Sequence, residues 1–260
     1  MPLPVPLSPG SLPVTPGRGT WWSAGQWSVL SVMRYQTWEP VYERILADFG
    51  YDRAGDERAR DVLARLCEPF DGRRLAALDG ATVAVCGGAD TLADELRLAR
   101  KADAVVAASV AADTLREARI GVDLMVTDLD KNPDTARSLT TEGVPVAVHA
   151  HGDNVEMVRQ RVPGFDDAFV LPTVQCEPVG PTENFGGFTD GDRAAFIADQ
   201  FGAAELVFPG WSFDDPDVTP EKRQKLVWAE RLLYWLEQQR DDCFALLDGR
   251  RDYIDASPLA

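Results

Sequence analysis

Short apolar runs alternate with longer amphipathic segments along most of the chain. Six such runs, most of them followed by acidic or glycine-rich sequence, cover residues 82–86, 104–109, 122–127, 144–149, 168–172 and 205–209. A short apolar run bounded by turn residues is typical of a strand buried on both faces. This alternation predicts an α/β fold with a mainly parallel six-stranded sheet flanked by helices.

Helical periodicity predicts further elements before and after the sheet. Apolar side chains recur at a spacing of three and four over residues 38–49, and Gly50 is suited to end that helix. A second helix is predicted over residues 56–66, and a long final helix over residues 221–247. The apolar stripe of the final helix is more typical of a core or dimer contact than of a ligand site.

The beginning of the chain differs in composition from the rest. Residues 1–20 contain six prolines and three glycines, which cannot build a packed element. The predicted organisation is a disordered or non-native leader over residues 1–32 and an N-terminal helical segment over residues 33–75. An α/β domain follows over residues 76–250, with a tail over residues 251–260.

Charge and length narrow the classes of partner. A chain of 260 residues can bury a sizeable core, and its net charge of −16 argues against nucleic acid and anionic membranes as partners. With 22 Arg and only four Lys, this acidic composition suits a protein that is soluble in concentrated salt. No apolar run approaches the roughly 20 residues needed to span a bilayer.

The four cysteines lie far apart in the sequence. None forms a Cys-x-x-Cys pair with another, so neither a zinc site nor a disulfide framework is indicated. This usage is consistent with a reducing cytoplasm.

Two aspartates follow the third apolar run. In Val126-Thr127-Asp128-Leu129-Asp130 the carboxylates are two residues apart, and an extended segment would point both to one side. Adjacent carboxylates repel each other unless a cation lies between them. At the carboxyl end of a parallel strand, where open sheets bind ligands, this pair is a candidate metal site. An acidic, solvated turn is the alternative.

The only two histidines follow the fourth apolar run, in His149-Ala150-His151-Gly152-Asp153-Asn154. On an extended segment both rings would face one side, near the edge of the sheet that carries the acidic pair. Gly152 permits a sharp turn, and Asp153 or Asn154 could cap the following helix. The alternative is an ordinary strand-to-helix turn with polar linkers.

A glycine-rich segment, Asn184-Phe185-Gly186-Gly187-Phe188-Thr189-Asp190-Gly191-Asp192-Arg193, precedes a predicted helix over residues 194–201. Its glycines allow a close backbone approach, and N–H groups at a helix start can hold phosphate oxygens. Arg193 adds a guanidinium fork suited to phosphate. Thr189 or Asp190 could instead serve only as the N-cap.

Two weaker signals concern phosphate. Gly87 and Gly88 follow the first apolar run where a nucleotide-binding loop would lie, but the loop is neither Gly-x-Gly-x-x-Gly nor a Walker loop. No dinucleotide or P-loop interpretation follows. Lys222 and Lys225 could reach a phosphate from the final helix, although a lysine on a helix surface is commonly just solvated.

Taken together, these clusters resemble the archaeal MptE-type 6-hydroxymethyl-7,8-dihydropterin pyrophosphokinases. The acidic pair, the histidine cluster and the glycine-rich segment carry the resemblance, in this order along the chain. Trp38-Glu39-Pro40-Val41-Tyr42 and the lysine-containing final helix extend it to about residues 33–248. The core is also similar to thiamin pyrophosphokinase, a parallel α/β domain that passes a diphosphate from ATP to an alcohol.

The resemblance implies a reaction of ATP with 6-hydroxymethyl-7,8-dihydropterin that gives AMP and the pterin diphosphate, with Mg²⁺, in folate or methanopterin biosynthesis. Two departures concern the substrate: Lys131 follows the acidic pair where a small residue is usual, and residues 87–92 lack the family's Pro-Ser.

Residue roles follow from the resemblance and agree with the chemistry of diphosphate transfer. The Mg²⁺ ligands are expected to be Asp128, Asp130 and Asp153. His149 or His151 would contact phosphate or assist deprotonation of the alcohol. Residues expected to bind the ATP phosphates are Gly87, Gly88, Gly186, Gly187, Thr189, Arg193, Lys222 and Lys225. Residues left for the pterin ring or a second metal are Asn154, Asn184, Asp190 and Asp192.

Other functions are compatible with the same predicted fold. The acceptor could be thiamin or another small alcohol, because residues outside the motifs decide it. A transferase using sugar nucleotides, or a nucleotide-binding protein without turnover, belongs to a different class. The intact acidic, histidine and glycine clusters argue against loss of activity. The chain could also form a homo-oligomer, which the sequence leaves open.

Overall fold

The sheet predicted from the apolar runs is present. The computed structural model describes residues 33–259; the leader predicted over residues 1–32 lies outside the described residues. Within them, six parallel strands form one sheet in the order β5-β4-β3-β2-β1-β6. The strands are β1 (Thr82–Cys86), β2 (Ala104–Ala108), β3 (Leu124–Thr127), β4 (Val146–Ala150), β5 (Val170–Val174) and β6 (Glu205–Val207). The prediction of a mainly parallel α/β fold is confirmed.

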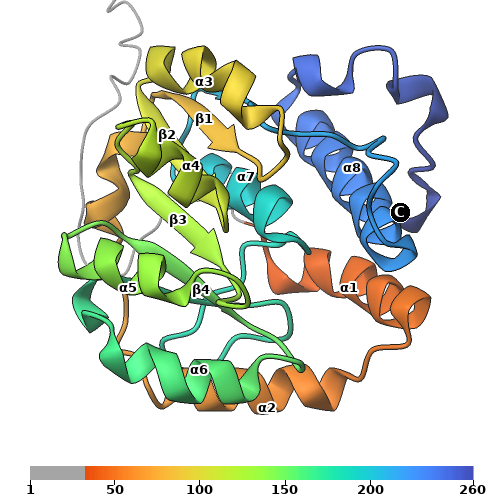
Figure 1. The fold of residues 1–260 in the computed structure, drawn as a ribbon. Coiled ribbons are helices and arrows are strands. Elements are labelled where there is room, and N and C mark those ends of the chain that lie inside the picture. Colours follow the sequence, from red (N-terminus) through yellow and green to blue (C-terminus); the bar gives the residue numbers. More distant parts are fainter. Residues whose placement is uncertain (1–32, 260) are drawn as a thin grey trace, which may run out of the picture. The chain divides into compact units, whose positions relative to one another are not determined.

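Helices cover both faces of this sheet (Figure 1). They are α1 (Tyr35–Phe49), α2 (Arg53–Ala64), α3 (Leu92–Lys101), α4 (Ala111–Glu117), α5 (Pro133–Thr141), α6 (Val155–Arg161), α7 (Asp190–Gln200) and α8 (Pro220–Arg240). From β1 to β4 each strand is followed by its spatial neighbour, and right-handed crossovers therefore place α3, α4 and α5 on one face. The chain then returns from β5 to β6 across the sheet, which places α7 on the opposite face.

Coverage on both faces explains the apolar strands. Every residue of the central strands β2, β3 and β4 is buried, as expected for parallel strands with helices on both sides, and the edge strand β5 is buried as well. Helix α7 is buried along most of its length under β1, β2 and β3, including its charged residues Asp192 and Arg193.

Three strands begin two residues later than predicted, and the first of them is β3, which starts at Leu124 instead of residue 122. Strand β4 starts at Val146, which pairs with Met125 of β3, and β5 starts at Val170, which pairs with Val146. A short 3-10 turn, Asp167–Phe169, occupies the predicted start of β5. An apolar run alone therefore does not distinguish the strand from the turn that leads into it.

The predicted end of the final helix was wrong. Helix α8 ends at Arg240 instead of residue 247, because Asp241 takes a left-handed conformation with φ 52°. Leu247 is still buried, but in a 3-10 turn, Ala245–Leu247, and Cys243 is exposed. The apolar spacing continued across this break because the turn packs on the same core.

The N-terminal helices are part of that core. Trp38 Nε1 donates to the Gln175 carbonyl oxygen at 2.8 Å, just beyond β5, and Tyr42 donates to Asp56 Oδ2 at 2.7 Å. Helix α1 ends at Gly50 as predicted, with φ 68°. These contacts hold α1 and α2 against the carboxyl end of the sheet, while the boundary between residues 75 and 76 stays a prediction. No helix in the described part of the chain is long and apolar enough to cross a membrane.

Candidate active site

A cavity of about 600 Å³ extends along the carboxyl ends of the strands. The loops after all six strands contribute to it, together with the start of α2 and one side of α8. The residues singled out from sequence that line it are Gly87, Gly88, Asp128, Asp130, His149, His151, Asp153, Thr189, Asp190, Lys222 and Lys225. Three separate sequence clusters therefore meet in one cavity.

The acidic pair lies on a tight turn. We expected an extended segment, but Leu129 adopts a left-handed conformation with φ 69°, so the chain turns directly after β3. Thr127 Oγ1 accepts from the Leu129 N–H at 2.9 Å, and Asp128 Oδ1 accepts from the Asp130 N–H at 3.1 Å. The turn brings both carboxylates into the cavity by a different route from the one that strand periodicity suggested.

Negative charge is concentrated around this turn. Burial and the adjacent Asp128 carboxylate raise the pKa of Asp130 to about 6. Burial alone would raise the pKa of Asp128, but hydrogen bonds from His151 and Asp130 hold it below its ordinary value. Burial and the nearby Asp128 carboxylate raise the pKa of Asp190 well above normal. A cation in the cavity would relieve this repulsion.

The carboxylates of this cavity suit a Mg²⁺ ion held by two side chains, but not one held by three. Among residues 33–259, no group of three or more His, Cys, Asp or Glu side chains is arranged to hold a metal ion. The three-carboxylate site that we expected is therefore not gathered, and Asp153 lies exposed at the cavity rim. Mg²⁺ commonly binds through only one or two carboxylates, with water and substrate phosphates as its other ligands. Asp128 and Asp130 meet that requirement.

His151 contacts the acidic pair directly. Its Nε2 lies 3.5 Å from Asp128 Oδ2, and its Nδ1 accepts from the Asp153 N–H at 3.4 Å. Because Nδ1 serves as the acceptor, the ring carries a hydrogen on Nε2, which faces the carboxylate.

His149 has a different environment although its ring stacks on that of His151, with centroids 5.9 Å apart. It is buried, and burial lowers its pKa well below normal, so the ring is neutral. Thr173 Oγ1 uses its hydrogen on the Val148 carbonyl at 3.2 Å and therefore accepts from His149 Nδ1–H, also at 3.2 Å. Nε2 keeps its lone pair and has no hydrogen-bond partner among the described residues.

Asn154 supports both clusters without lining the cavity. Its Nδ2 donates to the Asp128 carbonyl at 2.8 Å and to the His149 carbonyl at 2.7 Å. Its Oδ1 accepts from the His151 N–H at 2.9 Å. One carboxamide thus ties the end of β3 to the end of β4 and fixes the spacing between the acidic and histidine clusters.

Much of the glycine-rich segment lies behind the cavity. Gly186, Gly187, Arg193, Asn184 and Asp192 do not line it. Asn184 Nδ2 donates to the carbonyls of residues 175 and 176, and its Oδ1 accepts from the Gly186 N–H. Asn184 therefore shapes the loop instead of reaching a ligand.

The start of α7 explains the other buried residues of this segment. Thr189 is the N-cap, and Asp192 completes a capping box with it. The Arg193 guanidinium donates to the carbonyls of Gly186 and Phe188, at 3.4 and 3.1 Å. Burial lowers the pKa of Arg193 to about 10. Its side chain holds the loop from beneath, and Thr189 and Asp190 are the members of the segment that reach the cavity.

Several lining residues were not singled out from sequence: Tyr51, Asp52, Asp56, Arg58, Ser109, Gln175 and Trp211. Asp56 accepts from the Gly152 N–H and from Gln175 Nε2, both at 2.7 Å, which joins α2 to the histidine turn. Trp211 Nε1 donates to the Val85 carbonyl at 2.9 Å. Only the acidic start of α2 left a signal in the sequence, because Asp56 marked a predicted helix start.

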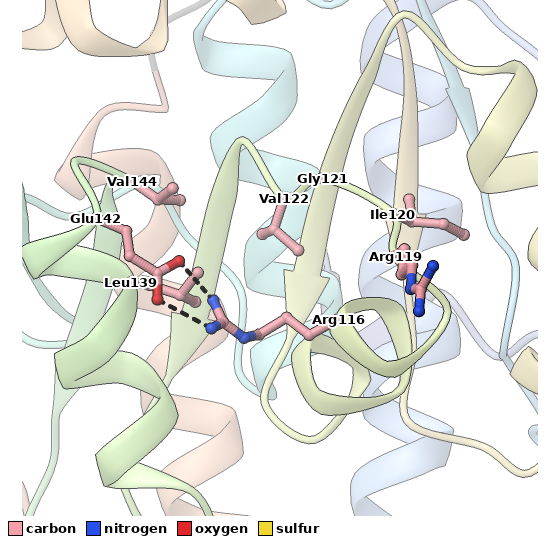
Figure 2. Close-up of a pocket in the computed structure, with 8 residues that line it drawn as sticks. All are labelled: Arg116, Arg119, Ile120, Gly121, Val122, Leu139, Glu142 and Val144. Atoms are coloured by element: carbon pink, nitrogen blue, oxygen red, sulfur yellow. Dashed lines mark hydrogen bonds and ion pairs between the residues drawn. The ribbon is translucent and has the colours of Figure 1, made fainter.

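A second cavity, of about 340 Å³, lies near the amino ends of β3 and β4 (Figure 2). Val122 and Val144, which precede these strands, form part of its wall. Arg116 and Glu142 join across it through two hydrogen bonds of 2.8 and 2.9 Å. None of the residues predicted to carry chemistry lines this cavity, so the first cavity is the candidate active site.

The fold and the cavity define a parallel α/β domain of the class that binds its ligand at the carboxyl ends of the strands. A family model described as 6-hydroxymethylpterin diphosphokinase MptE-like matches residues 63–217, and the chain belongs to this family.

Curated relatives are similar over most of the chain. A 6-hydroxymethyl-7,8-dihydropterin pyrophosphokinase of Methanothermobacter thermautotrophicus is 35% identical over 228 residues, covering 80% of this chain and 97% of the relative. The protein of the same name from Pyrococcus furiosus is 36% identical over 223 residues, covering 79% and 95%. That from Methanocaldococcus jannaschii is 28% identical over 235 residues, covering 80% and 97%.

Proposed function

We propose that this protein transfers a diphosphate from ATP to the hydroxyl of 6-hydroxymethyl-7,8-dihydropterin, giving AMP and the pterin diphosphate, with Mg²⁺. The observation that carries the proposal is the meeting of Asp128, Asp130 and both histidines in one cavity, in a member of this family. The three curated relatives bear the name of this activity.

The acidic pair would hold Mg²⁺ with the ATP phosphates and water as further ligands. When bound, the metal neutralises phosphate charge and polarises the β-phosphoryl group. Asp128 and Asp130 would hold the metal where they line the cavity after β3, and His151 Nε2–H keeps Asp128 oriented.

The chemical step is attack of the pterin hydroxyl oxygen on the β-phosphorus. The new O–P bond forms as the bond from the β-phosphorus to the α–β bridging oxygen breaks, and AMP leaves with the electron pair. The hydroxyl proton needs an acceptor, and His149 Nε2 offers a lone pair that the protein does not otherwise use. His149 therefore aligns the alcohol and receives its proton.

The remaining cavity residues suit charge neutralisation and positioning. Gly87, Gly88 and Thr189 would contact the phosphates, and Lys222 and Lys225 would face them from α8. Burial and the nearby Lys131 lower the pKa of Lys222. A phosphate bound near these two ammonium groups would raise that pKa again. Asp190 is left for the pterin ring or for a second metal.

The direct test is an acceptor comparison. The purified chain is incubated with ATP, Mg²⁺ and either 6-hydroxymethyl-7,8-dihydropterin or thiamin in high-salt buffer, and AMP is quantified. The proposal expects AMP release that depends on the pterin and exceeds the thiamin reaction. AMP release with thiamin alone would overturn the acceptor, and silence with both would overturn the activity.

A further inference from the structure

Ser109 occupies an unusual backbone position at the cavity. It follows β2 directly and has φ 47°, in the left-handed region that residues other than glycine rarely adopt. Its N–H donates to the Val126 carbonyl at 2.8 Å, and its carbonyl accepts from Asn132 Nδ2 at 3.1 Å. The β3 backbone and the loop after it therefore hold Ser109 in this conformation.

The Ser109 hydroxyl lacks a partner. Its Oγ is buried and makes no hydrogen bond to any described residue, although Ser109 lines the cavity. Asn132 Oδ1 is likewise buried and unpaired, so these two neighbouring groups are not bonded to each other. A buried hydroxyl without a partner is unfavourable, which indicates that a ligand supplies the missing bond.

Two main-chain donors lie on the same wall. Within residues 33–259 the N–H groups of Gly88 and Val110 make no hydrogen bond, and both residues line the cavity. The loops after β1 and β2 touch here: a Cβ on Gly88 would come within 2.7 Å of Val110 Cγ2. Glycine at this position thus keeps the two loops close, with Ser109 between Gly88 and the acidic pair.

We propose that the Ser109 hydroxyl donates a hydrogen bond to a phosphoryl oxygen of the nucleotide, beside the N–H groups of Gly88 and Val110. The inference rests on the proposed function, which supplies ATP. Neutral donors grouped on one wall suit an anion, and the adjacent strand end carries the carboxylates that suit its cation. The left-handed conformation of Ser109 places its hydroxyl beside these two N–H groups.

The test compares Ser109→Ala with Ser109→Gly in the full chain. Both remove the hydroxyl, but glycine also relieves the left-handed backbone, so together they separate a lost hydrogen bond from backbone strain. ATP binding is measured by calorimetry with Mg²⁺ and again in EDTA, and binding of the pterin is measured alone. Ser138→Ala, on α5 and outside the cavity, is the matched control.

Both Ser109 variants should weaken ATP binding by about tenfold, the effect of losing one hydrogen bond to a charged group, with and without Mg²⁺. Pterin binding and the Ser138→Ala protein should be unchanged. Wild-type affinity in either variant, or a loss seen only with Mg²⁺, would overturn the inference. If the wild-type chain binds ATP but transfers nothing to the pterin, the proposed function is wrong and the inference on Ser109 still stands. If the wild-type chain does not bind ATP, the proposed function and the inference on Ser109 are both wrong.

Discussion

His151 Nε2 and Asp128 Oδ2 lie 3.5 Å apart, with about a quarter of each side chain exposed to the cavity. This contact joins the acidic pair after β3 to the histidine cluster after β4. It also separates the two histidines chemically, because His151 presents a hydrogen to a carboxylate whereas His149 presents a lone pair. The roles proposed for them lead to different mutant kinetics.

Replacement of Asp128 or Asp130 with Asn should reduce turnover on the order of a hundredfold or more while leaving the fold intact. Each substitution keeps the side-chain shape but removes a charge that the metal requires. Turnover is measured as pterin-dependent AMP release, and folding by circular dichroism. Asp134→Asn is the control, since Asp134 lies exposed on α5 in contact with Arg161. Near-normal turnover in both cavity variants would rule out the metal assignment.

His149→Asn should lower kcat by about a hundredfold and leave the KM for ATP unchanged. Asparagine can place its amide near the position of Nδ1, and so keep the contact with Thr173, but it has no counterpart of Nε2. His149→Gln places an oxygen near Nε2 and should recover part of kcat. Steady-state kinetics at saturating pterin separate the two parameters. A wild-type kcat for His149→Asn would contradict the role given to Nε2.

The sequence was sufficient for the architecture because central parallel strands must be apolar on both faces. It was insufficient for the turn after β3. Strand periodicity suggested that Asp128 and Asp130 share a side by extension, whereas Leu129 reverses the chain with φ 69°. A left-handed leucine has no signature in the sequence, and its conformation depends on the Thr127 hydroxyl and on neighbouring strands.

Asn154→Asp should destabilise the protein by about 2 kcal/mol and lower turnover. The exchange is nearly isosteric, yet it replaces two N–H donors with an oxygen that faces the carbonyls of Asp128 and His149. Urea unfolding gives the free-energy change. Gln239→Glu on the exposed side of α8 controls for the added charge. Equal stability of Asn154→Asp and the wild-type chain would mean that the carboxamide does not brace the site.

Gly187→Ala should destabilise the fold by about 3 kcal/mol, combining overpacking with a strained backbone. Gly187 has φ 84°, and a Cβ there would lie 2.4 Å from the Arg193 Cα. Gly121→Ala is the matched control, because a Cβ at that position meets no atom within 4 Å. The unfolding midpoints of the two variants are compared in urea. If they are equal, the loop above Arg193 is not packed as described.

The glycine-rich segment shows why motif composition overstated the number of ligand contacts. Glycines, Asn184 and Arg193 suggested a phosphate cradle, but the same residue types also build a tight loop over a buried helix start. Arg193 points beneath that loop and contacts its carbonyls. Only packing reveals this orientation, and the same holds for Ser109, whose importance lies in one dihedral angle and one unpaired atom.

The most direct measurement is mass spectrometry of both products of one reaction mixture containing the chain, ATP, Mg²⁺ and 6-hydroxymethyl-7,8-dihydropterin. The account predicts equal amounts of AMP and a pterin that has gained two phosphoryl groups, and loss of both products in the Asp128→Asn protein. ADP with a pterin monophosphate, or AMP without a modified pterin, would contradict diphosphate transfer.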